Sequence, residues 1–508
     1  MRWIEPRRLT RRLAAVGLLV LLQSGATGVQ AEEPAGSSVD HAVVGMEEEE
    51  FADLRERLTE REDRNRVEDP WTTQLWGYPL TMAGEAELFL GWVDELSFGD
   101  PEEESFGRLL LEPNLEVEVF YSRGTPLSVF FQGRFAMEKD LLSETRDSIS
   151  DIFFERGEMW LISEDILESG FGFEIGRLDF EDDRRWWWDN ELDSIRGLYE
   201  TDNFEIALAL AREVAPTRTD LGEIDPEQED VTRMIAEVSW DWSDAHGLQV
   251  FALHQDDNSS RDRIGDVVRS LDEDPSDARL TWLGARAMGA WQLETRGIFG
   301  YWLDTAWVWG DERLSIFDDI APRRSVVEDV ARRDVSGWGV DLGVNWILPA
   351  AIEPRLYLGY AFTSRDRDPE TGTDRTFRQT GIHENESGFG GVQRFNQYGN
   401  LLDVELSNLS ILTAGTGISI LESSSVDLAY HYYRQIEPAT FLRDARLDPE
   451  LNGRNREVGH GLDLVLALEE WDVLEFEILL STFKSGRAFV VDRGDWNYGG
   501  FFSMRLAF

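Results

Sequence analysis

The chain has no cysteine among its 508 residues and only six histidines. Without cysteine it can have no disulfide, no thiolate zinc site and no cysteine nucleophile. The sequence also contains neither a His-Glu-x-x-His nor a Gly-x-Ser-x-Gly motif, which are common signatures of zinc proteases and serine hydrolases. Carboxylate pairs such as Asp182-Asp183 are frequent in a chain with 99 acidic residues, so they do not indicate a glycosidase. We therefore expect neither an enzyme nor a cofactor.

Long apolar runs are also missing. The mean hydropathy is −0.36, and no apolar run of about 18 residues occurs beyond the N-terminus, which excludes helical membrane spans. A chain of this composition crosses a bilayer only with strands.

Basic residues are few, 49 against 99 acidic ones, and the net charge is −50. About −45 of this charge lies beyond residue 70, so it is a property of the main domain. Phosphates would be repelled, which argues against nucleic acid and against anionic lipid head groups as partners. Two explanations remain open: long surface loops kept soluble by acids, or a cation-attracting lumen. Acidic clusters such as residues 256–258 and 272–274 lack the ordered spacing of an EF-hand, and we predict no discrete metal site. Divalent ions that bridge the outer loops stay open as an alternative.

The N-terminus has the features of an export signal. Basic residues between Arg2 and Arg12 precede an apolar stretch from Leu13 to Leu22, and small residues follow up to Ala31. We predict a secretory signal peptide at residues 1–31; a retained anchor helix is the alternative, but the stretch is short for a span. Residues 32–70 are charged and are expected to be flexible or to form a short amphipathic helix.

Residues 71–508 alternate with period two. At residues 502–508, apolar side chains occupy every second position and alternate with serine, arginine and alanine. The same alternation recurs in further segments, at residues 128–138, 204–210, 338–346, 462–469 and 474–480. An outer-membrane strand needs lipid on one side and water on the other. The pattern therefore predicts an all-β fold, a transmembrane antiparallel barrel of about 18 strands in the outer membrane of a Gram-negative bacterium.

Tryptophans and long polar connections fit this prediction. We expect most of the 19 tryptophans in aromatic girdles at the membrane interfaces, with stacking on sugar rings as the alternative. The tryptophans in question are Trp186, Trp187, Trp188, Trp240, Trp242, Trp302, Trp307 and Trp309. Long connections are predicted as extracellular or pore-folding loops, near residues 213–231, 255–278, 311–335, 364–408 and 435–459.

Three stretches, in order and spacing, resemble the alginate-export family of outer-membrane proteins. They are residues 175–190, with Ile175-Gly176-Arg177 and Trp187-Trp188-Asp189-Asn190; residues 218–221, Arg-Thr-Asp-Leu; and residues 379–409, from Gln-Thr-Gly through Arg394 to Glu-Leu-Ser-Asn-Leu. The similarity covers most of residues 85–508. It implies an eighteen-stranded, monomeric barrel through which an uronate polysaccharide leaves the cell. It also implies that a long inner loop, residues 379–409 here, partly plugs the pore.

The resemblance further implies arginines that attract uronate carboxylates and acids that hold those arginines in place. Arg394, Asp189 and Asp220 match such positions. Strand parity makes Arg134 a candidate for the lumen. Arg177 shares a face with apolar residues, so either a bulge turns it inward or it snorkels at the interface. Arg286 and Arg434 are further candidates for a lumen ladder of paired charges.

Several positions depart from the family pattern. Glu112, Asp179 and Asp403 stand where the family has basic pore residues, and parity turns Glu475 and Glu477 inward. Such a lumen favours cations or neutral sugars over polyuronates. Three functions therefore stay open: passive export of an alginate-like exopolysaccharide, a cation-preferring porin, and a surface structural barrel.

The expected partners follow from the predicted fold. They are the polysaccharide, membrane lipid, periplasmic secretion proteins, and the barrel-assembly machinery, whose recognition signal the terminal Phe508 resembles.

Overall fold

The computed structural model describes residues 70–508 with short gaps. The gaps are residues 96–97, 100–106, 125–126, 144–149, 227, 244, 260–262, 270–272, 322–323, 368–371, 390, 392 and 448. The predicted signal peptide at residues 1–31 lies outside the described residues, and so does all but the last residue of the charged segment at residues 32–70.

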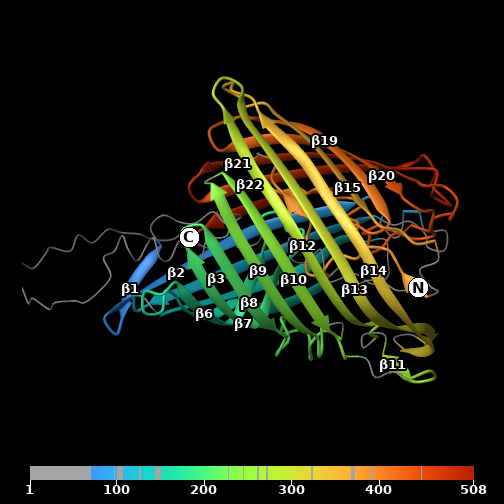
Figure 1. Ribbon diagram of the computed structural model, residues 1–508, viewed down its shortest axis with the longest axis horizontal. Coiled ribbons are helices and arrows are strands. Elements are labelled where there is room, and N and C mark those ends of the chain that lie inside the picture. Colours follow the sequence, from blue (N-terminus) through green and yellow to red (C-terminus); the bar gives the residue numbers. More distant parts are fainter. Residues whose placement is uncertain are drawn as a thin grey trace, which may run out of the picture.

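Eighteen antiparallel strands of the described chain form one closed barrel (Figure 1). They are β2 (Tyr78–Val93), β3 (Arg108–Ser122), β4 (Ser128–Ser143), β5 (Ser150–Ser163), β6 (Phe171–Glu181), β7 (Asp189–Thr201), β8 (Phe204–Ala211), β9 (Thr232–Ser243), β10 (His246–Asp256), β12 (Ser276–Leu293), β13 (Gly297–Ala321), β14 (Arg324–Ile347), β15 (Arg355–Thr363), β19 (Leu409–Ser419), β20 (Ser424–Gln435), β21 (Glu457–Trp471), β22 (Leu474–Ser485) and β23 (Trp496–Ala507). Strand β23 closes the barrel on β2, from Glu85↔Ala507 to Val93↔Gly499. The predicted fold class and strand number are confirmed.

Short strands complete the described part of the chain. They are β1 (Trp71–Leu75), β11 (Val267–Arg269), β16 (Thr373–Asp374), β17 (Glu386–Ser387) and β18 (Phe395–Asn396). β1 forms a hairpin with β2, β11 and β16 pair with β14, and β17 pairs with β18. Among the described residues, no helix is long and apolar enough to cross a membrane.

The two faces of the strands differ as the alternation predicts. On β4, Phe131 and Phe135 are 43% and 57% exposed, whereas Phe130 and Gln132 are 2% and 1% exposed. The exposed rings continue as a band of apolar side chains around the barrel, far larger than the patches that soluble monomers expose. An apolar band of this kind faces lipid, where a charged side chain at the centre would cost about 2–4 kcal/mol. The interior holds the polar residues.

Aromatic residues mark the two edges of this band. Trp307 and Trp309 are exposed on β13 at one edge, and Trp242 and Trp291 are exposed at the other. On β13, the ten steps from Phe299 to Trp309 rise about 33 Å along the strand, which a tilt of about 40° reduces to about 25 Å. That is the height of the hydrocarbon zone. We call the rim with the longer connections extracellular, as in other outer-membrane barrels.

Four of the eight tryptophans named in the prediction do not belong to these girdles, and for them the prediction is wrong. Trp186, Trp187 and Trp188 are at most 2% exposed and belong to the buried core cluster. Trp302 is buried on the inner face of β13, where its Nε1 donates to Asp341 Oδ1 at 2.8 Å. An indole buries a large apolar area and carries one donor, so it suits a polar barrel interior as well as an interface.

The predicted long loop at residues 311–335 is also wrong. These residues extend β13 and β14 beyond the membrane, with Asp311 opposite Asp334 and Glu312 opposite Arg333. Beyond the membrane both faces of a strand meet water, so apolar alternation disappears while the backbone ladder continues. In Figure 1 the two strands reach far past the barrel, to where β11 joins β14.

Candidate functional site

The connection between β15 and β19, residues 364–408, folds into the barrel, and we call it the inner loop. Most of its side chains from Thr376 to Asn408 are buried. Phe377 lies over Gly339 of β14, where an added Cβ would come within 2.7 Å of the ring. Tyr433 of β20 donates a hydrogen bond from its hydroxyl to Tyr398 O at 2.7 Å. The inner loop therefore packs against the inner face of several strands.

A second inward segment, residues 182–188, connects β6 to β7, and we call it the tryptophan loop. The carboxylate of Asp182 accepts the backbone N–H groups of Trp187 at 2.7 Å and Trp188 at 3.0 Å, so it orders the turn as an N-terminal cap does. The ring of Trp187 stacks on Phe251 of β10 at 4.7 Å, and Trp188 meets the same ring edge-on at 5.1 Å. These contacts fasten the tryptophan loop to the wall.

The two loops also bind each other. Trp186 Nε1 donates to the Tyr398 hydroxyl at 2.7 Å, and the Trp186 ring stacks on Phe377 at 6.0 Å. The backbone N–H of Asp189 donates to Ile382 O at 2.6 Å. The inner loop and the tryptophan loop thus form one layer inside the barrel.

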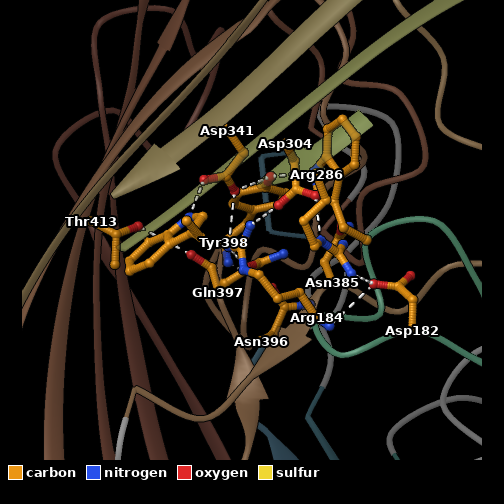
Figure 2. A network of polar contacts seen from close by, with 12 residues as sticks. Asp182, Arg184, Arg286, Asp304, Asp341, Asn385, Asn396, Gln397, Tyr398 and Thr413 are labelled. Atoms are coloured by element: carbon orange, nitrogen blue, oxygen red, sulfur yellow. Dashed lines mark hydrogen bonds and ion pairs between the residues drawn. The ribbon is translucent and has the colours of Figure 1, made fainter. Parts of the chain in front are cut away.

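A row of charges on the wall receives this layer. Arg286 of β12 lies opposite Asp304 of β13, which lies opposite Asp341 of β14. Arg286 Nε is 2.6 Å from Asp304 Oδ1, and a second nitrogen of Arg286 forms an ion pair with Asp182 of the tryptophan loop. All four side chains are buried (Figure 2).

Arg184 inserts between the two aspartates of this row. It forms ion pairs with Asp304 and, at 3.3 Å, with Asp341, and it also donates to Gln397 of the inner loop. The Tyr398 hydroxyl donates to Asp341 Oδ2 at 2.7 Å. Removing one member of such a buried pair costs about 3–5 kcal/mol because the other charge stays desolvated. Figure 2 shows how the residues from the wall and from both loops converge here.

A cavity of about 100 Å³ lies between the inner loop and the strands β2, β3, β22 and β23. Its charged lining residues are the arginines Arg108, Arg394 and Arg446 and the acids Glu384, Glu386, Asp403 and Glu477. The arginines are engaged by carboxylates: Arg108 with Asp140 at 2.6 Å, and Arg446 with Asp403 at 2.7 Å. The cavity is therefore lined by paired charges of both signs.

The predicted arginines Arg394 and Arg134 both lie inside the barrel. Arg394 of the inner loop is 2.9 Å from Glu181 at the end of β6. Arg134 of β4 bridges Glu116 at 3.1 Å and Glu155 at 3.3 Å. Only Arg394 lines the cavity.

The predicted acids Asp189 and Asp220 each lie against an arginine. Asp189 Oδ2 is 3.5 Å from Arg185 Nε. Asp220 accepts two hydrogen bonds from Arg218, at 3.1 and 2.8 Å, which is the fork geometry that orients a guanidinium most firmly.

Arg177 is buried, at 2% exposure, near Glu191 at 3.5 Å and Glu213 at 3.6 Å. The preceding Gly176 has φ +137°, and an added Cβ would lie 2.0 Å from Met159 O. This backbone, open only to glycine, accompanies the change from exposed to buried side chains along β6. Of the two interpretations left open, burial favours the inward one.

Arg434 lies on the outer face of β20, not in the interior. Its exposed side chain follows the exposed Leu428 and Tyr430, while the alternate residues Tyr433 and Gln435 are each 1% exposed. Counting every second residue from Leu428 also places Arg434 on the outer face. The prediction that it lies in a lumen ladder is therefore wrong.

Two predicted acids lie on the inner face of β22. Glu475 is 3.6 Å from Arg505 of β23, and Glu477 accepts a hydrogen bond from Gln393 of the inner loop at 3.1 Å. Glu477 thus connects the wall to the inner loop.

The other three predicted acids occupy different surroundings. Glu112 of β3 is 1% exposed. Asp179 of β6 lies opposite Glu191 of β7. Asp403 accepts from Asn396 at 2.7 Å and pairs with Arg446.

One acidic group of the extracellular loops could hold a divalent cation. Carboxylate oxygens of Asp257, Asp274 and Asp277 lie within 4.8 Å of one another, and burial raises the pKa of Asp274 to about 7. Asp277 also pairs with Arg313 at 2.8 Å. Oxygen ligands suit calcium or magnesium. The sequence shows Asp257 and Asp274 in two separate acidic clusters, and only the fold brings them together with Asp277.

Sequence reasoning found part of the network in Figure 2. Strand parity placed Arg286 and Asp341 at inward positions, but it did not single out Asp304 or show that the three charges form one row. Arg184 and Tyr398 lie in loops without periodicity, so no pattern in the sequence indicates their contacts.

Comparison with known proteins gives a family. A family model described as alginate export matches residues 115–496. The chain is 28% identical over 294 residues to the alginate production protein AlgE of Pseudomonas aeruginosa, covering 58% of this chain and 59% of that protein. It is 26% identical over 293 residues to AlgE of Azotobacter vinelandii, covering 55% and 58%. The chain thus spans less than two thirds of the length of these curated relatives.

Solved structures show the same fold. Pseudomonas aeruginosa OccK5 (OpdH) matches with a TM-score of 0.50 at 9% identity, covering 84% of this chain and 98% of that one. Acinetobacter baumannii OccAB4 matches with a TM-score of 0.50 at 8% identity and the same coverage. The barrel lies in the outer membrane, as the alternation predicted.

Proposed function

The chain belongs to the alginate export family, and on that premise we propose that it forms a pore through which an alginate-like polyuronate leaves the cell by passive diffusion. The observation that carries the proposal is the cavity beside the inner loop, with Arg108, Arg394 and Arg446 in its lining. Arginine is the side chain best suited to bind carboxylates in a fixed geometry.

Each of these arginines has a carboxylate partner within the protein. Arg394, for example, rests on Glu181 at 2.9 Å. A uronate unit presents the same carboxylate chemistry, so it can take the place of Glu181 without leaving a buried charge unpaired. The displaced glutamate then repels the polymer, so each uronate unit stays bound only briefly. Transport needs binding that is favourable but weak at every site.

The inner loop serves in this proposal as the plug. The cavity beside the inner loop, at about 100 Å³, is small even for a site that binds a small molecule. A polysaccharide chain needs more space, so residues 379–409 have to move when it passes. Asp189 and Asp220 keep the neighbouring Arg185 and Arg218 oriented while the inner loop is displaced.

The test is block of ion current by uronate oligomers in planar bilayers. Wild-type protein should be blocked by mannuronate oligomers at millimolar concentration, and Arg394→Gln should weaken the block about tenfold, the loss of one charge-assisted bond of about 1.5 kcal/mol. Arg434→Gln is the matched control, because it removes the same charge from the outer face. Equal block of wild type and Arg394→Gln would contradict the role of Arg394.

A cation-preferring channel is the second candidate, favoured by the acids. Four acids face three arginines in the cavity lining, and Glu475 lies on the same inner face as Glu477. A reversal potential that shows cation preference, together with no block by uronate oligomers, would support this candidate over export.

A further inference from the structure

The outer surface of the barrel carries a groove of about 670 Å³ at the extracellular edge of the apolar band. Its floor contains four aromatic rings, Trp307, Trp338, Tyr360 and Phe362. Trp307 lies opposite Trp338 on the neighbouring strand, and the rings of Tyr360 and Phe362 stack at 5.4 Å. β13, β14 and β15, which carry the rings, lie side by side in Figure 1. The floor is thus part of the aromatic girdle.

Four arginines line the extracellular side of the same groove, Arg365, Arg375, Arg434 and Arg456. Arg365 and Arg375 lie in the first part of the inner loop, just after β15, Arg434 lies at the end of β20, and Arg456 lies just before β21. In a chain with 49 basic and 99 acidic residues, this concentration of guanidinium groups is unusual.

The neighbouring acids neutralise this cluster only in part. Glu437 is shared among three guanidinium groups, with Arg367 at 2.7 Å, Arg456 at 3.3 Å and Arg365 at 3.7 Å. Arg375 forms an ion pair with Asp366 at 3.8 Å. The exposed Arg434 forms no ion pair with any residue that the structure describes, and its side chain is free to bind an anion from outside. A net positive charge remains.

We propose that this groove binds the phosphorylated head group of an anionic glycolipid in the outer leaflet. The position decides the ligand class, because the aromatic floor meets the acyl chains while the arginines stand at head-group level. Arginine binds phosphate oxygens in pairs of parallel hydrogen bonds. The volume of the groove fits a sugar phosphate rather than a lone ion. The proposal is independent of what passes through the barrel, since the groove opens away from the interior.

The proposal runs against the sequence-based expectation that a chain of charge −50 avoids anionic lipid. Most of the acidic residues are far from the groove, and charges separated by more than about 8 Å are largely screened at physiological ionic strength. A ligand in the groove therefore meets the local arginines first. Counting charges along the sequence cannot detect this arrangement, because Arg375 and Arg434 are brought together only by the fold.

The experiment measures binding of diphosphorylated lipid A to the full-length purified barrel by native mass spectrometry in detergent. Wild type should retain one lipid per barrel, and Arg434→Ala combined with Arg456→Ala should lower the affinity at least tenfold. Arg269→Ala with Arg279→Ala is the matched control, since both are exposed arginines elsewhere, each paired with one acid. A heat-dependent shift in gel mobility confirms that each variant is a folded barrel.

Two further arms identify the source of the phosphate. Trp338→Ala should weaken lipid A binding without changing the weak binding of inorganic phosphate, because only the lipid has acyl chains on the aromatic floor. Dephosphorylated lipid A should bind as weakly to wild type as lipid A binds to the double arginine variant. Unchanged lipid A affinity in that variant would overturn the proposal. Tighter binding of inorganic phosphate or of uronate oligomers than of lipid A at these arginines would overturn it as well.

Discussion

Tyr398→Phe removes one hydroxyl from the place where the inner loop meets the wall. That hydroxyl donates to Asp341 Oδ2 at 2.7 Å and accepts from Trp186 Nε1 at 2.7 Å. Phenylalanine keeps the shape of the ring, so the packing of the 2% exposed side chain stays as it is. The substitution therefore isolates the contribution of two hydrogen bonds to the docking of the inner loop.

The size of the effect follows from these two bonds. A hydrogen bond to a carboxylate contributes about 1.5–3 kcal/mol, and leaving an indole N–H buried without a partner costs about 1–3 kcal/mol. Relaxation around the site recovers part of this, so we take about 3 kcal/mol for the pair. Since 1.4 kcal/mol changes an equilibrium tenfold, the ratio of displaced to docked inner loop should rise about 100-fold.

Single-channel recording in planar bilayers measures this ratio as the fraction of time spent in high-conductance states. As long as the high-conductance states are rarely occupied, Tyr398→Phe should raise that fraction about 100-fold. Tyr498→Phe, on the exposed outer face, should leave it unchanged. A folded Tyr398→Phe barrel with the gating of wild type would refute the reasoning, because the inner loop would then not be held by this contact or would not control the current.

Two other substitutions test the interior and the loops. Gly337→Ala should raise conductance, because the added Cβ would lie 2.4 Å from Thr376 O and push the inner loop off β14; Gly222→Ala, with open space around it, is its control in the same recordings. Asp274→Asn tests the extracellular acids by pH. Burial raises the pKa of Asp274 to about 7 from 3.8, so its stabilising contribution is complete below about pH 4 and is lost as the pH rises through 7. In EDTA, Asp274→Asn should leave the unfolding temperature unchanged at pH 4 and raise the free energy of unfolding by up to about 4 kcal/mol at pH 9. A stability difference between variant and wild type that is equal at both pH values would contradict the assignment. Calcium should remove the difference at pH 9 if the cluster binds the ion.

The alternation in the sequence was enough to predict the barrel and the inward face of many strands. Each strand repeats the same physical requirement, lipid on one side and water on the other, so errors at single positions do not accumulate. Arg134, Glu475 and Glu477 were placed inside by this rule alone, and their side chains do lie on the inner face.

The rule fails where a side chain leaves the regular strand or where both faces are wet. At Gly176 the backbone enters a region open to glycine, and Arg177 is buried against parity. The tryptophan loop has the composition of a girdle, yet Asp182 folds it into the interior. Residues 311–335 show no apolar alternation because both faces of these strands meet water. In the sequence, such strands look the same as a loop.

The buried ion pairs between the strands and the two loops also determine how the inner loop can be released. Replacing buried ion pairs by well-packed apolar side chains is often neutral or stabilising, so the pairs of Arg184 with Asp304 and Asp341 are not the strongest attachment that the interior could make. They are an attachment that an ionic ligand can exchange. A carboxylate polymer that reaches Arg184 offers the same partner that Asp341 provides, whereas an apolar contact would give it nothing to replace. On the proposed function, the substrate itself then releases the inner loop. Between the blocking events, uronate oligomers should therefore raise the fraction of time in high-conductance states more for wild type than for Tyr398→Phe, in which part of the attachment is already gone.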